Sequence, residues 1–147
     1  MKAGIYYVGD PCYLFDQSWQ KILNETNYLK DGKHIIFGET VFCGSTAYGD
    51  GCYKDNFGRR YGVDAGLIGI LPVSLLDIDK KVSQEEVKNS NYMHIVEMKE
   101  DFDCSVHKGV FRFGDIKINT RDVSDEIEEG EGEEWVIAHC IYQHYLS

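Results

Sequence analysis

The residues best suited to chemistry lie in a glycine-rich segment between Gly38 and Gly69, which holds 8 of the 15 glycines of the chain. Glycine lets the backbone turn through positive φ and approach a ligand closely. Tyrosines, hydroxyls, carboxylates and two arginines lie between these glycines, and such groups orient polar ligands. The same pattern also fits tight β-turns that bind nothing. Together with the turn after the first predicted strand, the segment supplies the candidate ligand-binding residues: Asp10, Cys12, Tyr13, Ser45, Thr46, Tyr48, Asp50, Tyr53, Arg59, Arg60 and Asp64.

Two catalytic arrangements are the alternative to simple binding. Cys12, beside Asp10 in a turn restricted by Pro11, could act as a thiolate nucleophile with a distant histidine. Asp10, Asp50 and Asp64 could instead gather as a small hydrolase site for acid–base or metal-assisted chemistry. The sequence lacks a phosphate-loop motif, a calcium loop and closely spaced cysteine or histidine pairs typical of metal sites. It therefore favours a non-catalytic binding protein that needs no cofactor and no metal.

The negative charge is concentrated in one acidic tract. The formal net charge is −10, yet residues 122–134 hold 8 acidic residues and no basic one, and the other 134 residues hold 17 acidic and 15 basic residues. Dense like charges, together with Gly130 and Gly132, predict a mobile surface loop. A second hypothesis is that this loop binds a basic host protein, which would make the chain a protein-interaction inhibitor. The acidic balance argues against direct binding to nucleic acid or to an anionic membrane.

The elements that must position these side chains are mainly β-strands. A helix is predicted over residues 17–25 with Asp16 as its N-cap, and residues 83–86 have the form of a capping box. Lys108-Gly109 fits a two-residue hairpin turn. We expect a single α+β domain over residues 1–147, mainly β, as an antiparallel sandwich or open barrel with one or two short helices. The predicted strands cover residues 3–8, 34–37, 40–43, 61–63, 67–71, 92–98, 102–106, 110–118 and 135–142.

Composition also indicates where the protein acts. The longest apolar run, residues 67–76, is about half the roughly 20 residues that a membrane span requires. Residues 1–5 lead directly into a strand, so we expect no secretory signal. Five cysteines without close pairing predict reduced thiols and a cytoplasmic location. Exposed sheet edges favour a homo-oligomer.

Three motifs resemble a group of small hypothetical proteins of tailed bacteriophages and bacteria. They are GDPCY at residues 9–13, STAYGDGCY at residues 45–53 and YGVDAGLIG at residues 61–69. The resemblance covers roughly the first half of the chain and implies a phage-type accessory protein in the host cytoplasm. Such proteins often bind a host protein, or trap or degrade a nucleotide-derived immune signal. The resemblance therefore implies antagonism of host defence signalling, through a small polar ligand or a host protein.

Overall fold

The computed structural model describes residues 1–121, which form three antiparallel β-sheets and a few short helices. The expectation of a mainly β fold of the α+β class is confirmed. The acidic tract 122–134 and the strand predicted at 135–142 lie outside the described residues. The elements in chain order are β1 (Gly4–Gly9), α1 (Trp19–Glu25), β2 (Gly32–Ile36), β3 (Glu39–Ser45), β4 (Gly51–Lys54), β5 (Arg60–Val63), β6 (Leu67–Pro72), α2 (Leu76–Asp79), α3 (Gln84–Lys88), β7 (His94–Met98), β8 (Cys104–His107), β9 (Val110–Phe113) and β10 (Ile116–Asn119).

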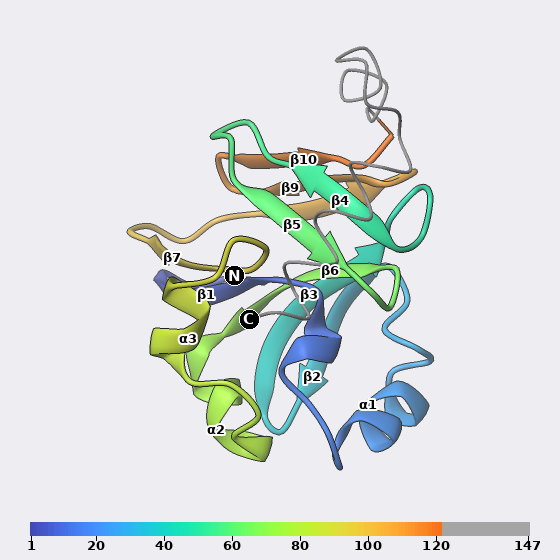
Figure 1. Ribbon diagram of the computed structural model, residues 1–147, viewed down its shortest axis with the longest axis vertical. Coiled ribbons are helices and arrows are strands. Elements are labelled where there is room, and N and C mark those ends of the chain that lie inside the picture. Colours follow the sequence, from blue (N-terminus) through green and yellow to red (C-terminus); the bar gives the residue numbers. More distant parts are fainter. Residues whose placement is uncertain (122–147) are drawn as a thin grey trace.

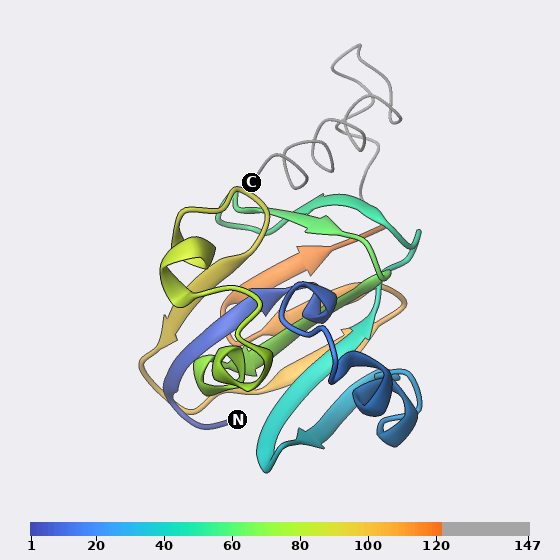
Figure 2. The same cartoon turned by 60° about the horizontal axis from the view of Figure 1, so that its bottom comes forward.

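A five-stranded sheet in the order β2-β3-β6-β1-β7 forms the middle of the molecule. Helices α1 and α2 lie against one face of this sheet, and the short strands β4, β5 and β8–β10 lie across the other (Figures 1 and 2). The short strands form the sheet β10-β9-β8 and the hairpin β4-β5, which a bridge between Asp55 and Ile118 connects. We call these five short strands the outer layer.

Strand β6 shows why both faces of the middle sheet are covered. Its residues are apolar in succession, and all except Pro72 are buried, as the sequence predicts. Leu67 and Leu71 belong to the core on the helix side, whereas Ile68 and Ile70 belong to the core beneath the outer layer. The fold is therefore a layered sandwich with a hydrophobic core on each side of one sheet.

Local signals determine the turn between β8 and β9 and the start of α3. Lys108 and Gly109 both have positive φ, at 49° and 81°, as a two-residue hairpin turn requires. Ser83 Oγ accepts the Glu86 N–H at 3.1 Å, and the Glu86 carboxylate accepts the Ser83 N–H at 3.0 Å. The predicted hairpin turn and the predicted capping box are both confirmed.

The prediction of Asp16 as the N-cap of α1 is wrong. The helix begins at Trp19, and Ser18 is the N-cap residue. Asp79 in α2 accounts for the difference, because its carboxylate accepts the Asp16 N–H at 2.7 Å and the Ser18 hydroxyl at 2.7 Å. Hydrogen bonds to Asp79 of α2 thus fix the chain before α1. Within residues 1–121 no helix has the length and apolar character needed to cross a bilayer.

Candidate functional site

Asp10 joins two of the predicted segments at the end of β1, where it caps a 3₁₀ turn at Pro11–Tyr13. Its side chain is buried, and its Oδ1 accepts the Cys12 N–H at 2.9 Å. Its Oδ2 accepts the N–H groups of Asp64 at 2.9 Å and Ala65 at 2.7 Å. Burial raises the pKa of Asp10, and the N–H donors partly oppose that shift. Asp10 therefore holds the backbone of its own chain together.

Cys12 and Tyr13 also serve the structure around Asp10. Burial raises the pKa of the Cys12 thiol, and the neighbouring Asp10 carboxylate raises it further. Such a thiol stays protonated near neutral pH, whereas the thiolate is the nucleophilic form. Tyr13 is buried and packs edge-to-face on Tyr92, with ring centroids 5.2 Å apart. The geometry thus opposes a nucleophilic Cys12 and places Tyr13 in the core.

The three carboxylates of the alternative hydrolase site have different surroundings. Asp10 is buried, whereas Asp50 and Asp64 are exposed. Among residues 1–121, no group of three or more His, Cys, Asp or Glu side chains is arranged to hold a metal ion. In this part of the chain, the hydrolase alternative has no assembled site.

Arg59 and Arg60 lie in different surroundings on the β4-β5 hairpin. Arg59 Nη1 lies 2.9 Å from Asp55 Oδ2, and its guanidinium lies 5.1 Å from the centroid of the Phe57 ring. The exposed Arg60 lies opposite Lys54 in the register of the β4-β5 hairpin. Arg60 thus belongs to the outer layer and Arg59 to the turn before it, and neither lines the cavity formed by the loop after β3.

Ser45, Thr46 and Tyr48 do come together around the loop after β3, and Tyr53 of β4 contacts the same loop. Thr46 is buried; its Oγ1 donates to the Gly49 carbonyl at 2.6 Å, and its N–H donates to the Gly66 carbonyl at 3.0 Å. Tyr53 is buried as well, and its hydroxyl donates to the same Gly49 carbonyl at 3.0 Å. These bonds fix the loop and leave the Tyr48 side chain 60 % exposed. Tyr53 contributes support from the core and no ligand-facing surface.

The loop after β3 forms one wall of an open cavity of about 410 Å³, which we call the loop cavity. The turn between β8 and β9 supplies another wall, and the end of the described chain supplies a third. The polar side chains that line the loop cavity are Asp31, Ser45, Thr46, Tyr48, Lys108 and Arg121.

Gly109 allows two walls of the loop cavity to approach closely. Its φ is 81°, and a Cβ there would lie 2.6 Å from Thr120 Oγ1 and 2.8 Å from Ala47 Cβ. The buried Thr120 Oγ1 donates to the Gly109 carbonyl at 2.5 Å and accepts the Ala47 N–H at 2.8 Å. The two walls are therefore joined by hydrogen bonds at a distance that only glycine permits.

The charges of the loop cavity favour an anion. Among the described residues that line the loop cavity, Lys108 and Arg121 are cations and Asp31 is the one carboxylate; Asp31 Oδ1 accepts the Ser45 N–H at 2.9 Å. Sequence reasoning did not identify Asp31, Lys108 or Arg121 as site residues. The Lys108-Gly109 turn can be recognised from the sequence, but its position beside the loop cannot. That position depends on Thr120, which bonds to Gly109 and also to Ala47, 73 residues earlier in the chain.

A larger open groove of about 990 Å³ runs beside β7 and the segment that follows it. Its charges are mixed, with more carboxylates than cations, so it does not favour an anionic ligand. The carboxylates are Glu97, Glu100, Asp101, Asp103 and Asp115, and the cations are Arg59, Lys99 and Arg112.

Comparisons with known proteins assign no function to this fold. No family model, no curated protein and no solved structure matches the chain. The functional interpretation therefore depends on the geometry of the loop cavity.

Proposed function

We propose that the protein is a non-catalytic binding protein for a small anionic ligand that carries an aromatic ring, with a nucleotide as the representative chemistry. The observation that supports this is the loop cavity, in which Lys108 and Arg121 lie with the exposed ring of Tyr48. Lysine and arginine bind phosphate oxygens, and a tyrosine ring stacks on a base. A volume of about 410 Å³ suits a ligand of this size.

The fixed walls of the loop cavity support binding in a second way. Thr46 and Thr120 hold the loop and the turn through hydrogen bonds that exist without a ligand. A site that is already ordered loses less conformational entropy when a ligand binds. The affinity is then set mainly by the contacts of Lys108, Arg121 and Tyr48.

The resemblance to phage proteins extends the proposal to the biological role. In that setting the ligand is a nucleotide-derived signal of host defence, and the protein lowers its free concentration by binding it. Sequestration requires affinity and no turnover. The buried Asp10 and the protonated Cys12 agree with that requirement.

The test is a thermal-shift screen of the full chain against nucleoside monophosphates, cyclic mononucleotides and cyclic dinucleotides. A ligand at 100 times its Kd adds about 2.7 kcal/mol to the stability of a one-site protein. For a chain of this length that raises Tm by roughly 5–10 °C. Calorimetry on the best ligand then gives Kd. Analysis of the ligand recovered after incubation tests for turnover, and we expect it to be intact.

Two matched pairs of variants locate the site. Tyr48→Ala should raise Kd about tenfold, because a stacked ring contributes about 1–3 kcal/mol. Tyr28→Ala is its control, since Tyr28 is 62 % exposed and lies outside the loop cavity. Lys108→Gln should likewise weaken binding, and Lys33→Gln should not. If no ligand raises Tm, or if each control weakens binding as much as its partner, the proposal is wrong.

A further inference from the structure

The outer layer has an unusual charge for a protein with a net charge of −10. Its five strands contain no aspartate and no glutamate. Their inward side chains are apolar or aromatic and lie over the middle sheet. The outward positions carry four cations, which we call the basic face: Lys54, Arg60, Arg112 and Lys117.

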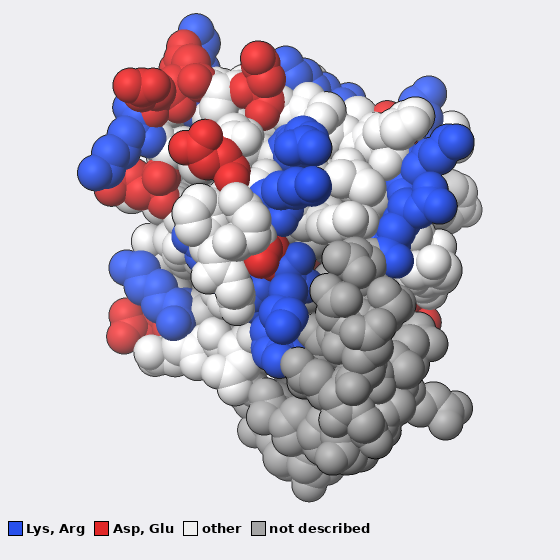
Figure 3. Space-filling model, turned by 90° about the horizontal axis from the view of Figure 1, so that it is seen from above, with Lys and Arg blue, Asp and Glu red and all other residues white. Residues whose placement is uncertain are grey.

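The register of the strands places these four cations in two cross-strand pairs. Lys54 lies opposite Arg60, and Lys117 lies opposite Arg112. The bridge between Asp55 and Ile118 sets β4 beside β10 and places Lys117 opposite Asn56, so the two pairs are staggered by two residues and together cross four neighbouring strands. Adjacent strands are about 4.8 Å apart, so the basic face extends roughly 15 Å. Figure 3 shows Lys and Arg side chains across this side of the molecule, with the largest group of carboxylates toward one edge.

Four cations on strands that carry no carboxylate give this face a positive charge, which attracts an anionic chain. The sequence provides such a chain. Residues 122–134 hold 8 acidic residues and no basic one, and they follow Arg121, two residues after the end of β10. Strand β10 itself carries Lys117 of the basic face.

We propose that the basic face is a binding surface for acidic polypeptide, and that its occupant is the acidic tract 122–134 of the same chain. A 13-residue segment spans at most about 45 Å when extended, which is enough to cover a face of roughly 15 Å. Tethering also gives the tract a local concentration in the millimolar range. A free polyanion such as nucleic acid must compete with the tethered tract for the basic face. This agrees with the net negative charge of the chain, which argues against nucleic-acid binding.

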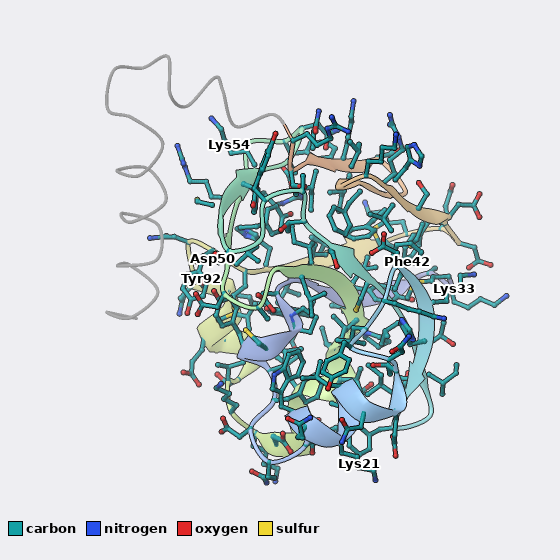
Figure 4. The ribbon with its side chains drawn as sticks, turned by 90° about the vertical axis from the view of Figure 1, so that its right-hand side faces the viewer. Lys21, Lys33, Phe42, Asp50, Lys54 and Tyr92 are labelled. Atoms are coloured by element: carbon teal, nitrogen blue, oxygen red, sulfur yellow. The ribbon has the colours of Figure 1, made fainter. Side chains whose placement is uncertain are left out.

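Zero-length carbodiimide crosslinking of the full chain tests this directly, because it joins a carboxylate to a lysine amine in contact. Tract carboxylates should crosslink to Lys54 and Lys117 at least about fivefold more than to Lys21 and Lys33. Lys54 lies at the top of the molecule, Lys21 at the opposite end and Lys33 to one side (Figure 4). In 1 M salt, where the Debye length is about 3 Å, the preference should be lost.

A pair of double variants tests the charge of the face. Arg60→Gln with Arg112→Gln removes two charges and keeps both lysine amines, so crosslinking to Lys54 and Lys117 should fall about threefold. Lys30→Gln with Lys88→Gln removes two charges that lie outside the outer layer and should leave the yield unchanged. Equal yields at all four probed lysines, or no response to the arginine substitutions, would overturn the proposal.

Two further measurements identify the occupant. In a 1:1 mixture of ¹⁴N- and ¹⁵N-labelled protein, crosslinks within one chain carry a single isotope, as we expect. Mixed-isotope crosslinks would assign the tract to a second copy instead. Addition of a deoxythymidine oligonucleotide at micromolar concentration should not reduce the crosslinks. If it abolishes them, the basic face prefers nucleic acid, and the acidic tract is not its occupant.

Discussion

Two buried aspartates lie at opposite ends of the β4-β5 hairpin, and their surroundings differ. Asp10 meets the open end, where it accepts the N–H groups of Asp64 and Ala65. Asp55 lies at the turn, where its Oδ2 accepts the Tyr61 hydroxyl at 2.7 Å and the Arg59 guanidinium at 2.9 Å. The hairpin thus offers Asp10 only backbone N–H groups, whereas it offers Asp55 a cation and a phenol besides the N–H groups of Phe57 and Arg59.

The two sets of hydrogen-bond donors shift the balance between the charged and the protonated form differently. Burial raises the pKa of Asp10, and the backbone donors do not reverse the shift. Burial also acts to raise the pKa of Asp55, but the hydrogen bonds from Tyr61 and Arg59 outweigh it and the pKa is lowered. The donors around Asp55, which include a cation and a phenol, outweigh burial and favour the ionised form, whereas the backbone donors and the Cys12 thiol around Asp10 do not.

The largest loss of stability is expected for Asp10, whose backbone donors would have no other acceptor. Asp10→Ala leaves the N–H groups of Cys12, Asp64 and Ala65 without the carboxylate, and the free energy of unfolding should fall by about 4 kcal/mol. Urea unfolding measures this loss. Asp50→Ala, at an exposed carboxylate, should change stability by less than about 0.5 kcal/mol. A loss below about 1 kcal/mol for Asp10→Ala would mean that the junction does not depend on this side chain.

Asp55→Ala should have a somewhat smaller effect, a loss of about 3 kcal/mol. The Arg59 side chain is 34 % exposed, so its guanidinium can return to water, whereas the Tyr61 hydroxyl stays buried. A double-mutant cycle with Tyr61→Phe measures the coupling between the carboxylate and the phenol. We expect about 1 kcal/mol of coupling. Additive effects would show that the hydrogen bond contributes nothing to stability.

Several elements could be predicted because their signals are local. The Lys108-Gly109 turn needs only two residues that accept positive φ, and the Ser83–Glu86 capping box needs only its own side chains. The run Leu67–Leu71 is apolar on successive residues, which indicates burial on both faces wherever the strand lies. These features depend little on distant parts of the chain.

The candidate site could be predicted only in part, because its walls meet through distant contacts. Tyr13 and Tyr53 looked like ligand-facing hydroxyls, yet both rings are buried in the core. Strand β4 was missed because Gly51 and the glycines and polar residues before it indicate a loop, and only pairing with β5 makes it a strand. Arg121 follows β10, and no local pattern places it beside Tyr48.

The walls of the loop cavity are joined by the neutral hydroxyl of Thr120, so their stability can be compared with that of the two carboxylate sites. Gly109→Ala would force a Cβ to 2.6 Å from Thr120 Oγ1 at a φ of 81°. We expect a loss of about 2.5 kcal/mol, from left-handed strain and from overpacking. Gly38→Ala is the matched control, because its φ is 79° and no atom lies within 4 Å of the new Cβ. Strain alone should cost it about 1 kcal/mol, and equal losses at both glycines would show that the close approach is not tight.

The pH dependence of stability tests the difference between Asp10 and Asp55 most directly, because the contributions of the two aspartates should change with pH in opposite directions. A carboxyl whose folded pKa is raised binds more protons when folded, so the contribution of Asp10 should fall as pH rises above about 4. The pKa of Asp55 is lowered, so its contribution is complete above about pH 4 and is lost as pH falls.

Urea unfolding of the native chain, Asp10→Asn and Asp55→Asn between pH 3.5 and 7.5 separates the two. Destabilisation by Asp10→Asn should shrink as pH rises, and destabilisation by Asp55→Asn should grow. Asp50→Asn, at the exposed carboxylate, corrects for the general effect of losing a charge. Slopes of the same sign would show that burial, and not the donors around each carboxylate, controls both sites.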